Sequence, residues 1–350
     1  MTAPLTGPHP ARVAVDALGG DFGLGVVVAG VVEACRELPV QVQLVGPRSQ
    51  IEQALRHAGQ LRNIEVLDAP DAVEMAEKVS RATLKKRSSM LVGLERVRDG
   101  QADAFFSAGN TAACWAIAKM VLGTLDEVDR PALAAVVPNR VSHTLLIDVG
   151  ANANCKVRQL EEFAVMGAIY SQAVLGTPRP RVGLMSVGEE ETKGTDLTRE
   201  VHEALKGSLL NFVGNVEGHD LFSGKVDVVV MDGFTGNVAL KASETLAESI
   251  LHLLREEIER SSPFVRLGAL MARSAFRKVR KRIDPAEYGG ALLLGVRGAC
   301  VIGHGKSSAY AIKQGVRAAA GFHSSGVNAS IERELRELAA RRDAATTRSP

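Results

Sequence analysis

Two loops rich in small residues constrain the fold of this chain most strongly, because each follows an apolar strand and precedes a helix. The first expected strand, 182–185, leads into the loop 188–195, after which residues 196–206 have helical composition. The second strand, 226–230, is rich in valine, which is typical of a strand buried in a parallel sheet, and it leads into 232–237. In open α/β sheets, ligands bind at the carboxyl ends of strands, where helix N-termini attract anions. We therefore expect both loops to bind an anionic ligand.

The same strand, loop and helix plan recurs along the chain. Further strands are expected at 12–15, 40–46, 64–67, 102–106, 133–137, 144–149 and twice within 288–302, with helices over 24–38, 49–57, 74–100, 111–122, 160–175, 234–260 and 307–320. This alternation predicts an α/β protein, a multi-layer α/β/α arrangement around a largely parallel sheet. We expect one catalytic unit of one or two lobes over 12–322, a disordered lead-in over 1–11 and a polar tail over 323–350 that carries a surface helix.

The positive charge of the chain is concentrated in one segment. The formal net charge is only +2, yet residues 255–282 hold nine Lys and Arg against three Glu. Ser261, Ser262 and Pro263 are expected to break the preceding helix, so the sequence predicts a protruding helical hairpin over about 240–282. Its second arm is basic and amphipathic, which favours a subunit interface or an anionic membrane surface, and the two are compatible. With one Trp and three Tyr in the chain, nucleic acid is not an expected partner.

Several classes of protein lack support in the sequence. The four cysteines are widely separated with no CxxC pair, no run of 18 apolar residues occurs, and the first residues do not form a signal peptide, so we expect a cytoplasmic protein. The GxGxxG fingerprint fails at Val28, and a P-loop ending in Gly305-Lys306-Ser307 fails at Cys300. There is no GxSxG or HExxH motif. We expect no cofactor and no metal.

These exclusions leave the substrate itself as a source of the nucleophile. Glycine-rich loops with Lys193 and Asn237 suit a bound phosphate that attacks a carbonyl group. Lys193 would hold the phosphate oxygens, unless it is an ordinary surface lysine, and one of the neighbouring Glu189–Glu191 side chains would orient it through an ion pair. Asn237 would donate to the oxygen that gains charge, unless it caps a helix. His304 is a general acid or, as we favour, part of a turn.

Ten motifs in order along the chain carry a resemblance to a known family. They are DALGGD (16–21), KKRSSM (85–90), SAGNT (107–111), DVGAN (148–152), FAVMG (163–167), GEEETKG (188–194), NFVGNVEG (211–218), DGFTGN (232–237), and the pair GGALLLGV and GHGKS (289–307). With them the chain resembles the PlsX family of bacterial phosphate acyltransferases over about residues 12–320. It departs from the usual family pattern at Gly23-Leu24, Leu293 and Lys306.

The resemblance implies a reaction and a fold. Long-chain acyl-ACP and inorganic phosphate would give acyl phosphate and free acyl carrier protein, and a membrane glycerol-3-phosphate acyltransferase would take the product. The implied fold is similar to that of phosphotransacetylase and the isocitrate dehydrogenase group. A homodimer attached peripherally to the inner face of the cell membrane through the hairpin is also implied, with contacts at Phe264, Leu267, Leu270 and Met271. The acidic carrier protein would dock on a basic surface, either Lys85, Lys86 and Arg87 or the hairpin arm.

The motifs also place the site residues. In the resembled family the lysine of the GEExxKG loop and the asparagine that closes DGFTGN are the proposed catalytic groups, which here are Lys193 and Asn237. The expected substrate- and phosphate-binding residues are Asp16, Gly19, Gly20, Asp21, Ser107, Gly109, Asn110, Thr111, Asn152, Gly188, Gly233, Thr235, Gly236 and His304. Three alternatives remain: an acyl-CoA donor as in phosphotransacetylase, a dehydrogenase of the same fold, and a membrane-surface scaffold that recruits the carrier protein without turnover.

Overall fold

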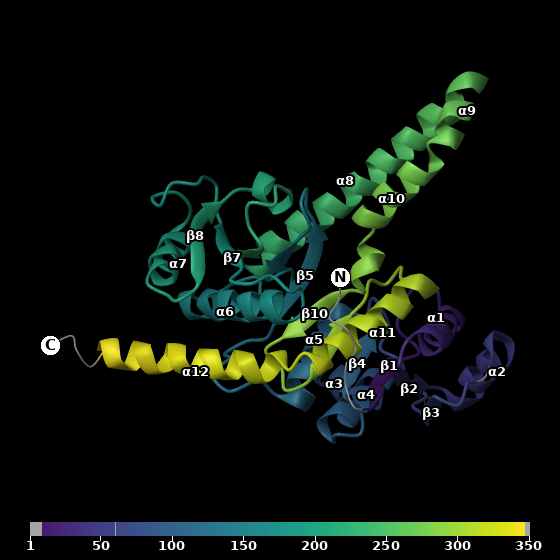
Figure 1. Ribbon diagram of the computed structural model, residues 1–350. Coiled ribbons are helices and arrows are strands. Elements are labelled where there is room, and N and C mark those ends of the chain that lie inside the picture. Colours follow the sequence, from purple (N-terminus) through teal and green to yellow (C-terminus); the bar gives the residue numbers. More distant parts are fainter. Residues whose placement is uncertain (1–8, 60, 347–350) are drawn as a thin grey trace.

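A single sheet runs through the computed structural model, which describes residues 9–59 and 61–346 (Figure 1). Its strands are β1 Ala11–Asp16, β2 Val40–Gly46, β3 Ile64–Asp68, β4 Ala104–Ser107, β5 Ala132–Pro138, β6 His143–Ile147, β7 Arg181–Met185, β8 Asn211–Val216, β9 Val228–Val230, β10 Ala291–Leu294 and β11 Ala299–Ile302. Within the described residues the eleven strands lie in the order β3-β2-β1-β4-β11-β10-β5-β6-β9-β7-β8. Most of the lead-in expected over 1–11 lies outside the described residues, which begin at residue 9. Strand β1 already begins at Ala11.

The sheet consists of two parallel sets joined by an antiparallel centre. The first set is β3, β2, β1, β4 and β11, and the second is β6, β9, β7 and β8. Between them, β10 runs antiparallel to both β11 and β5, and β5 runs antiparallel to β6. The predicted α/β fold with a largely parallel sheet is confirmed, as is the pairing of the strands expected at 133–137 and 144–149.

Twelve helices lie within the described residues, and those outside the hairpin α8–α10 cover both faces of this sheet (Figure 1). They are α1 Leu24–Glu37, α2 Arg48–Ala58, α3 Arg81–Lys85, α4 Ser89–Arg98, α5 Thr111–Leu122, α6 Val157–Ala173, α7 Asp196–Lys206, α8 Gly233–Arg260, α9 Pro263–Met271, α10 Arg273–Ile283, α11 Ala309–Ser324 and α12 Val327–Thr346, with short 3₁₀ turns at Gly218–Phe222 and Pro285–Tyr288. Alternate strand residues face opposite layers: Val13 and Val15 lie in one buried cluster and Ala14 in the other.

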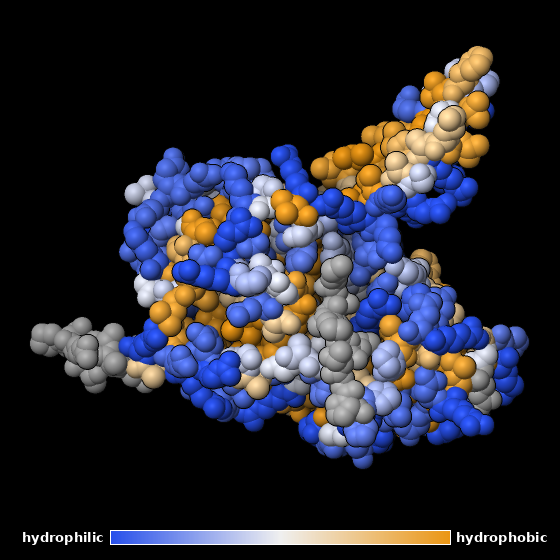
Figure 2. All heavy atoms as spheres, in the orientation of Figure 1, coloured by the Kyte–Doolittle hydropathy of each residue, from blue (hydrophilic) through white to orange (hydrophobic). Residues whose placement is uncertain are grey.

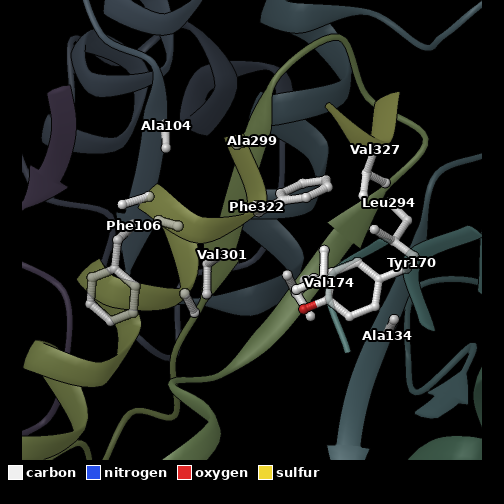
Figure 3. Packing of buried hydrophobic residues seen from close by; sticks show 14 of the residues in the cluster. Ala104, Phe106, Ala134, Tyr170, Val174, Leu294, Ala299, Val301, Phe322 and Val327 are labelled. Carbon is white, nitrogen blue, oxygen red and sulfur yellow. The ribbon is translucent and has the colours of Figure 1, made fainter. Parts of the chain in front are cut away.

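One of these clusters extends across both parallel sets. Figure 3 shows Phe106 of β4, Phe322 of α11 and Tyr170 of α6 in the same buried cluster. The Tyr170 and Phe322 rings pack edge to face with centroids 6.0 Å apart. Because the core is continuous, the two strand sets are held together by packing as well as by the sheet.

The polar tail expected from residue 323 differs from the structure. Residues 327–346 form α12, which packs against α6 (Figure 1), and Val327, Ile331 and Leu335 are buried in the same core cluster. These apolar residues recur every four positions among charged ones, which places them on one face of a helix. Charged residues make up 8 of the 20 positions of this helix, so a composition count hides the apolar stripe.

The helix expected over 74–100 is also wrong in part. Helix begins only at Arg81, is interrupted between Lys85 and Ser89, and ends at Arg98. The Asn110 amide donates to the carbonyl oxygens of Glu74, Met75 and Glu77. A tertiary contact thus satisfies backbone groups that a helix would otherwise pair within itself.

Helices α8, α9 and α10 form the expected hairpin, which protrudes from the body (Figure 1). Pro263 stands in the first turn of α9, as expected for a proline that stops one helix and starts the next. The second arm is two helices rather than one. Apolar side chains gather over much of the hairpin surface (Figure 2), and Phe264 and Met271 are 87% and 80% exposed. Among the described residues, no helix is both long and apolar enough to span a membrane.

Candidate active site

Three loops meet at the carboxyl ends of β6, β9 and β7. Ile147, Val230 and Leu184 lie side by side across these parallel strands, so the segments that follow them leave the sheet at the same edge. We call residues 148–152, 186–194 and 232–237 loop cluster two. It contains both proposed catalytic residues. Lys193 lies on the loop after β7, and Asn237 lies at the start of the helix after β9.

Asp148 organises this cluster, although the sequence did not single it out as a site residue. Its Oδ1 accepts hydrogen bonds from the backbone N–H groups of Leu133, Gly150 and Ala151 at 3.0–3.1 Å. Its Oδ2 accepts from the N–H of Asn152 at 2.7 Å and from the Asn152 amide at 2.9 Å. Burial raises the pKa of Asp148, whereas these donors act to lower it. The carboxyl group thereby holds the loop after β6 in place.

The first turn of α8 rests directly on that loop. A Cβ atom on Gly236 would lie 1.9 Å from the carbonyl oxygen of Asp148, so only glycine permits this approach. The Gly233 N–H donates to the Asn152 carbonyl at 2.7 Å. Asp232 caps the helix, because its side chain accepts from both the N–H and the hydroxyl of Thr235. The Thr235 hydroxyl, which was predicted to bind substrate, is therefore already hydrogen-bonded to Asp232.

Asn237 lies one turn beyond the cap. The N-cap is Asp232, so the alternative in which Asn237 caps the helix is wrong. The Asn237 amide lies beside Gly150, with its Cγ 3.7 Å from the position of a Cβ on that glycine. No hydrogen bond to this amide is formed by any residue that the structure describes. Its N–H groups are free to donate to a ligand at the positive end of α8.

Lys193 is exposed and its ammonium is also free. The expected ion pair with Glu189, Glu190 or Glu191 is wrong for the described residues, because Glu191 pairs with Lys206 at 2.9 Å and Glu189 lies 3.9 Å from Lys225. No other described carboxylate lies within ion-pair distance of Lys193. In the same loop the hydroxyl of Ser186 is buried without a hydrogen-bond partner. Ser186 is a further candidate ligand group, and only the structure reveals it.

A second group of loops follows β1, β4 and β11, which are also neighbours in the sheet. We call residues 16–21, 107–111 and 303–307 loop cluster one. Asp16 is buried at its centre and accepts from the hydroxyls of Ser89 at 2.5 Å and Ser107 at 2.7 Å. Burial raises its pKa, and the hydroxyl donors act to lower it. Gly19 allows the close contact between these loops, since its Cβ would lie 2.8 Å from the Gly109 nitrogen.

Several predicted ligand groups of loop cluster one are occupied by the protein itself. The Asn110 side chain caps α5 through the Ala113 N–H and donates to the carbonyls of residues 74–77. His304 Nδ1 accepts from the Lys306 N–H at 3.1 Å, which supports its interpretation as a turn residue. The Asp21 N–H donates to the Gly305 carbonyl at 2.7 Å. These residues shape the loops, which leaves backbone groups and exposed Thr111 as the candidate ligand contacts of this cluster.

Helix α8 connects the two clusters. It starts against loop cluster two, and two turns beyond Asn237 it carries the half-buried Glu244 near His304 of loop cluster one. Burial raises the pKa of Glu244, and the charge of His304 opposes the shift. Eleven residues separate Gly233 from Glu244, which corresponds to about 16 Å of helix. The structure therefore brings the remaining predicted residues, Gly20 and Gly188 included, to two loop clusters that one helix joins.

Comparison with known proteins identifies the family. A family model described as "Fatty acid synthesis protein" matches residues 11–330. The phosphate acyltransferase of Acidobacterium capsulatum is 50% identical over 326 residues, covering 92% of this chain and 96% of that protein. The phosphate acyltransferase of Aquifex aeolicus is 44% identical over 329 residues, covering 93% and 97%.

A solved structure shares the fold at much lower identity. The phosphotransacetylase from Streptococcus pyogenes superimposes with a TM-score of 0.63 at 16% identity, covering 89% of this chain and 94% of that one. At this identity the likeness concerns the fold alone. The family match spans all six loops described above and both free side chains, so the chain belongs to the fatty acid synthesis protein family, the PlsX family that its ten motifs resemble.

Proposed function

We propose that this protein transfers a long-chain acyl group from acyl carrier protein to inorganic phosphate, and so supplies acyl phosphate for phospholipid synthesis. Family membership makes the chain an acyltransferase. The observation that carries the proposal is that Lys193 and Asn237 present unpaired polar groups on neighbouring loops, whereas Asp16, Asn110 and Thr235 are engaged within the protein.

Lys193 binds the phosphate in this proposal. Its ammonium is a flexible point charge with three donors, and it lies on a loop whose next helix, α7, begins at Asp196. The unpaired Ser186 hydroxyl adds a donor from the same loop. Phosphate held there needs no deprotonated protein nucleophile, because one of its own oxygens attacks the thioester carbonyl. The C–O bond forms as the C–S bond breaks, and the thiolate of the carrier's prosthetic group leaves.

Asn237 stabilises the intermediate. The carbonyl oxygen of the thioester gains negative charge when phosphate attacks, and an amide N–H at the N-terminal end of α8 is suited to receive it. Removal of one such donor costs about 2.7–4 kcal/mol of transition-state stabilisation in enzymes that use this device. The Asp148 contacts hold the loop beneath Asn237, so the donor is oriented before the substrate arrives.

Basic side chains support acyl carrier protein, an acidic partner, as the acyl donor. Arg277, Lys278 and Arg280 of α10 are exposed and form no ion pair with any described residue. Lys86 is a weaker candidate, because its ammonium lies 3.5 Å from Glu77. We favour the α10 face as the docking surface, since free charges attract an acidic partner more strongly than paired ones.

The hairpin supports two further parts of the proposal. Phe264, Leu267, Leu270 and Met271 are exposed at the tip beside the basic α10, a combination suited to reversible contact with the inner face of an anionic membrane. Leu246, Ile250 and Leu253 form a separate exposed apolar stripe on α8, which suits the interface of a homodimer. Membrane contact would bring the product close to the glycerol-3-phosphate acyltransferase that takes it.

The reaction is tested by trapping acyl phosphate with hydroxylamine while free carrier protein is measured. Palmitoyl-ACP and phosphate are supplied to the parent protein, to Lys193→Ala and to Lys206→Ala, a control lysine whose ammonium is already paired with Glu191. We expect phosphate-dependent product from the parent and the control, and about a hundredfold less from Lys193→Ala. Product from acyl-CoA but not from acyl-ACP would show that acyl-CoA is the acyl donor. Absence of phosphate-dependent product from both donors would overturn the proposal and favour a scaffold.

A further inference from the structure

A buried histidine next to the Lys193 loop has one ring nitrogen without a hydrogen bond. His202 of α7 is 3% exposed, and its ring packs edge to face on Phe212 with centroids 5.1 Å apart. Its Nδ1 lies 2.9 Å from the Oδ1 of Asn215. The Asn215 amide nitrogen donates to the Glu190 carbonyl at 2.9 Å, and this bond fixes which end of the amide faces the ring. Nδ1 is therefore the donor in this bond, and Nε2 is the ring nitrogen left to meet another group.

Nε2 faces carboxylates. It lies 3.6 Å from Oε1 of Glu191, and the ligand atoms of Glu191, His202 and Glu203 all lie within 4.8 Å of one another. Within residues 9–59 and 61–346, no partner lies within 3.5 Å of Nε2, and its contact with Glu191 is a long one. One imidazole nitrogen and two carboxylates gathered within this distance form an electron-rich site that a cation would stabilise.

We propose that Glu191, His202 and Glu203 bind a zinc-like transition metal ion. One imidazole nitrogen and two carboxylate oxygens are ligands that Zn²⁺ accepts, and three protein ligands leave a fourth position for water. Ca²⁺ and Mg²⁺ prefer oxygen ligands throughout, so the histidine selects against them. Asn215 supplies the outer partner that metal-binding histidines commonly have, a carbonyl oxygen that receives the N–H of the other ring nitrogen.

A second cluster on the same side of the domain provides a contrast. Ligand atoms of Glu189, His219 and Asp220 are equally close to one another, but the Lys225 ammonium lies 3.3 Å from Asp220 Oδ1 and 3.9 Å from Glu189. A cation of the protein already neutralises that cluster. The proposed site also has a lysine, since the Lys206 ammonium donates to both Glu191 oxygens at 2.9 and 3.0 Å, but this pair is more than half exposed on both sides and, within the described residues, Lys206 forms no ion pair with Glu203. Such a pair is weak and is readily displaced by a divalent ion.

The position of the site links metal binding to the catalytic loop. Glu191 stands two residues before Lys193, and His202 and Glu203 stand on α7. A metal bound to all three ties the loop 188–194 to a rigid helix. The bound ion therefore restricts the loop that carries the phosphate-binding lysine, and metal binding can be measured without any acyl substrate.

The test uses the full chain without an affinity tag, stripped of metal by a chelator and then titrated with Zn²⁺ alone in a calorimeter. We expect one site per chain in the parent. His202→Gln and Glu203→Gln remove it, and Asn215→Ala keeps all three ligands but weakens binding about ten- to a hundredfold. His219→Ala, in the contrasting cluster, leaves the affinity unchanged. Glu203 is exposed, so its variant tests the site even if His202→Gln fails to fold.

A second readout reports on the loop. Zn²⁺ should slow amide hydrogen exchange in residues 188–194 of the parent and not of Glu203→Gln. Co²⁺ should give the visible absorption of a four-coordinate ion that only the parent and His219→Ala share. Absence of stoichiometric Zn²⁺ binding, or binding that survives His202→Gln and Glu203→Gln, would overturn the proposal.

Discussion

Replacement of Gly236 by alanine tests whether loop cluster two controls the position of Asn237. The added Cβ would lie 1.9 Å from the carbonyl oxygen of Asp148, whereas Cβ contacts below 3.0 Å are essentially never found. That oxygen belongs to a backbone held by five hydrogen bonds to the Asp148 side chain, so it cannot easily retreat. The first turn of α8 must therefore move by at least 3.0 − 1.9 = 1.1 Å.

The expected loss of stability in Gly236→Ala is too small to unfold the protein, whereas a displaced Asn237 would raise the reaction barrier substantially. Alanine is favoured over glycine within a helix by about 0.8–1.0 kcal/mol, and overpacking a tight contact costs about 1–3 kcal/mol. The net loss of stability is therefore at most about 2 kcal/mol. A catalytic group that moves by about 1 Å can lose a hundredfold in rate, which corresponds to about 2.7 kcal/mol of barrier. We expect Gly236→Ala to remain folded and to lose about a hundredfold in activity.

The assay pairs acyl phosphate formation with urea unfolding for Gly236→Ala and Gly268→Ala. Gly268, in α9, is a matched control, because a Cβ on it would meet no atom within 4 Å. The control should keep full turnover with soluble substrate. Full activity of Gly236→Ala would show that contact with Asp148 does not position Asn237. A loss of activity in step with unfolding would assign the effect to stability alone.

Three further predictions concern the core, loop cluster one and the hairpin. Ile331→Ala should lower the free energy of unfolding by about 2–5 kcal/mol, since Ile331 is fully buried, while Arg333→Ala changes it by less than about 0.5 kcal/mol. Equal unfolding curves for the two variants would show that α12 does not stabilise the core. Burial raises the folded pKa of Asp16 above its ordinary 3.8, so the stability that this group contributes is present at low pH and is lost as pH rises through the folded pKa. Urea unfolding at a series of pH values should accordingly show Asp16→Asn gaining on the parent as pH rises, and a constant difference would contradict the assignment. Phe264→Asp combined with Leu267→Asp should reduce co-sedimentation with anionic vesicles and leave soluble turnover intact, whereas equal sedimentation would exclude the tip as the membrane contact.

Strand-and-loop periodicity predicted the sheet and the positions of its loops, because buried parallel strands have a strong local signature. Strands at 182–185 and 226–230 are examples, and their loops do meet at one edge. Long-range hydrogen bonds are not visible in local pattern. The non-helical course of residues 74–80 depends on the Asn110 amide, which lies more than 30 positions away. The local sequence pattern therefore predicts a helix through a segment that a distant side chain keeps in a non-helical conformation.

The sequence pattern also does not show which polar side chains are hydrogen-bonded within the protein and which are free. Asp16 and Thr235 are residue types that commonly bind ligands, yet Asp16 accepts from the Ser89 hydroxyl and the Thr235 hydroxyl donates to the Asp232 carboxylate. Asp148, inside the motif DVGAN, organises its loop through five hydrogen bonds within the protein. Which polar group is free depends on partners brought together by the fold, and Lys193 and Asn237 keep their candidacy because the described residues leave them unpaired.

Helix α8 explains why the hairpin and the chemistry should respond separately to mutation. Its 28 residues run from the candidate active site to the hairpin tip, yet among them only Gly233 and Gly236 are buried. The helix is thus fastened at its first turn, by the Asp232 cap and the contact with Asp148, and is otherwise held by its neighbours in the hairpin. From Asn237 to Arg260 the helix rises about 34 Å. A substitution at the hairpin tip lies at the far end of this helix from Asn237. It can therefore abolish contact with the membrane surface while the first turn of α8 keeps Asn237 in place.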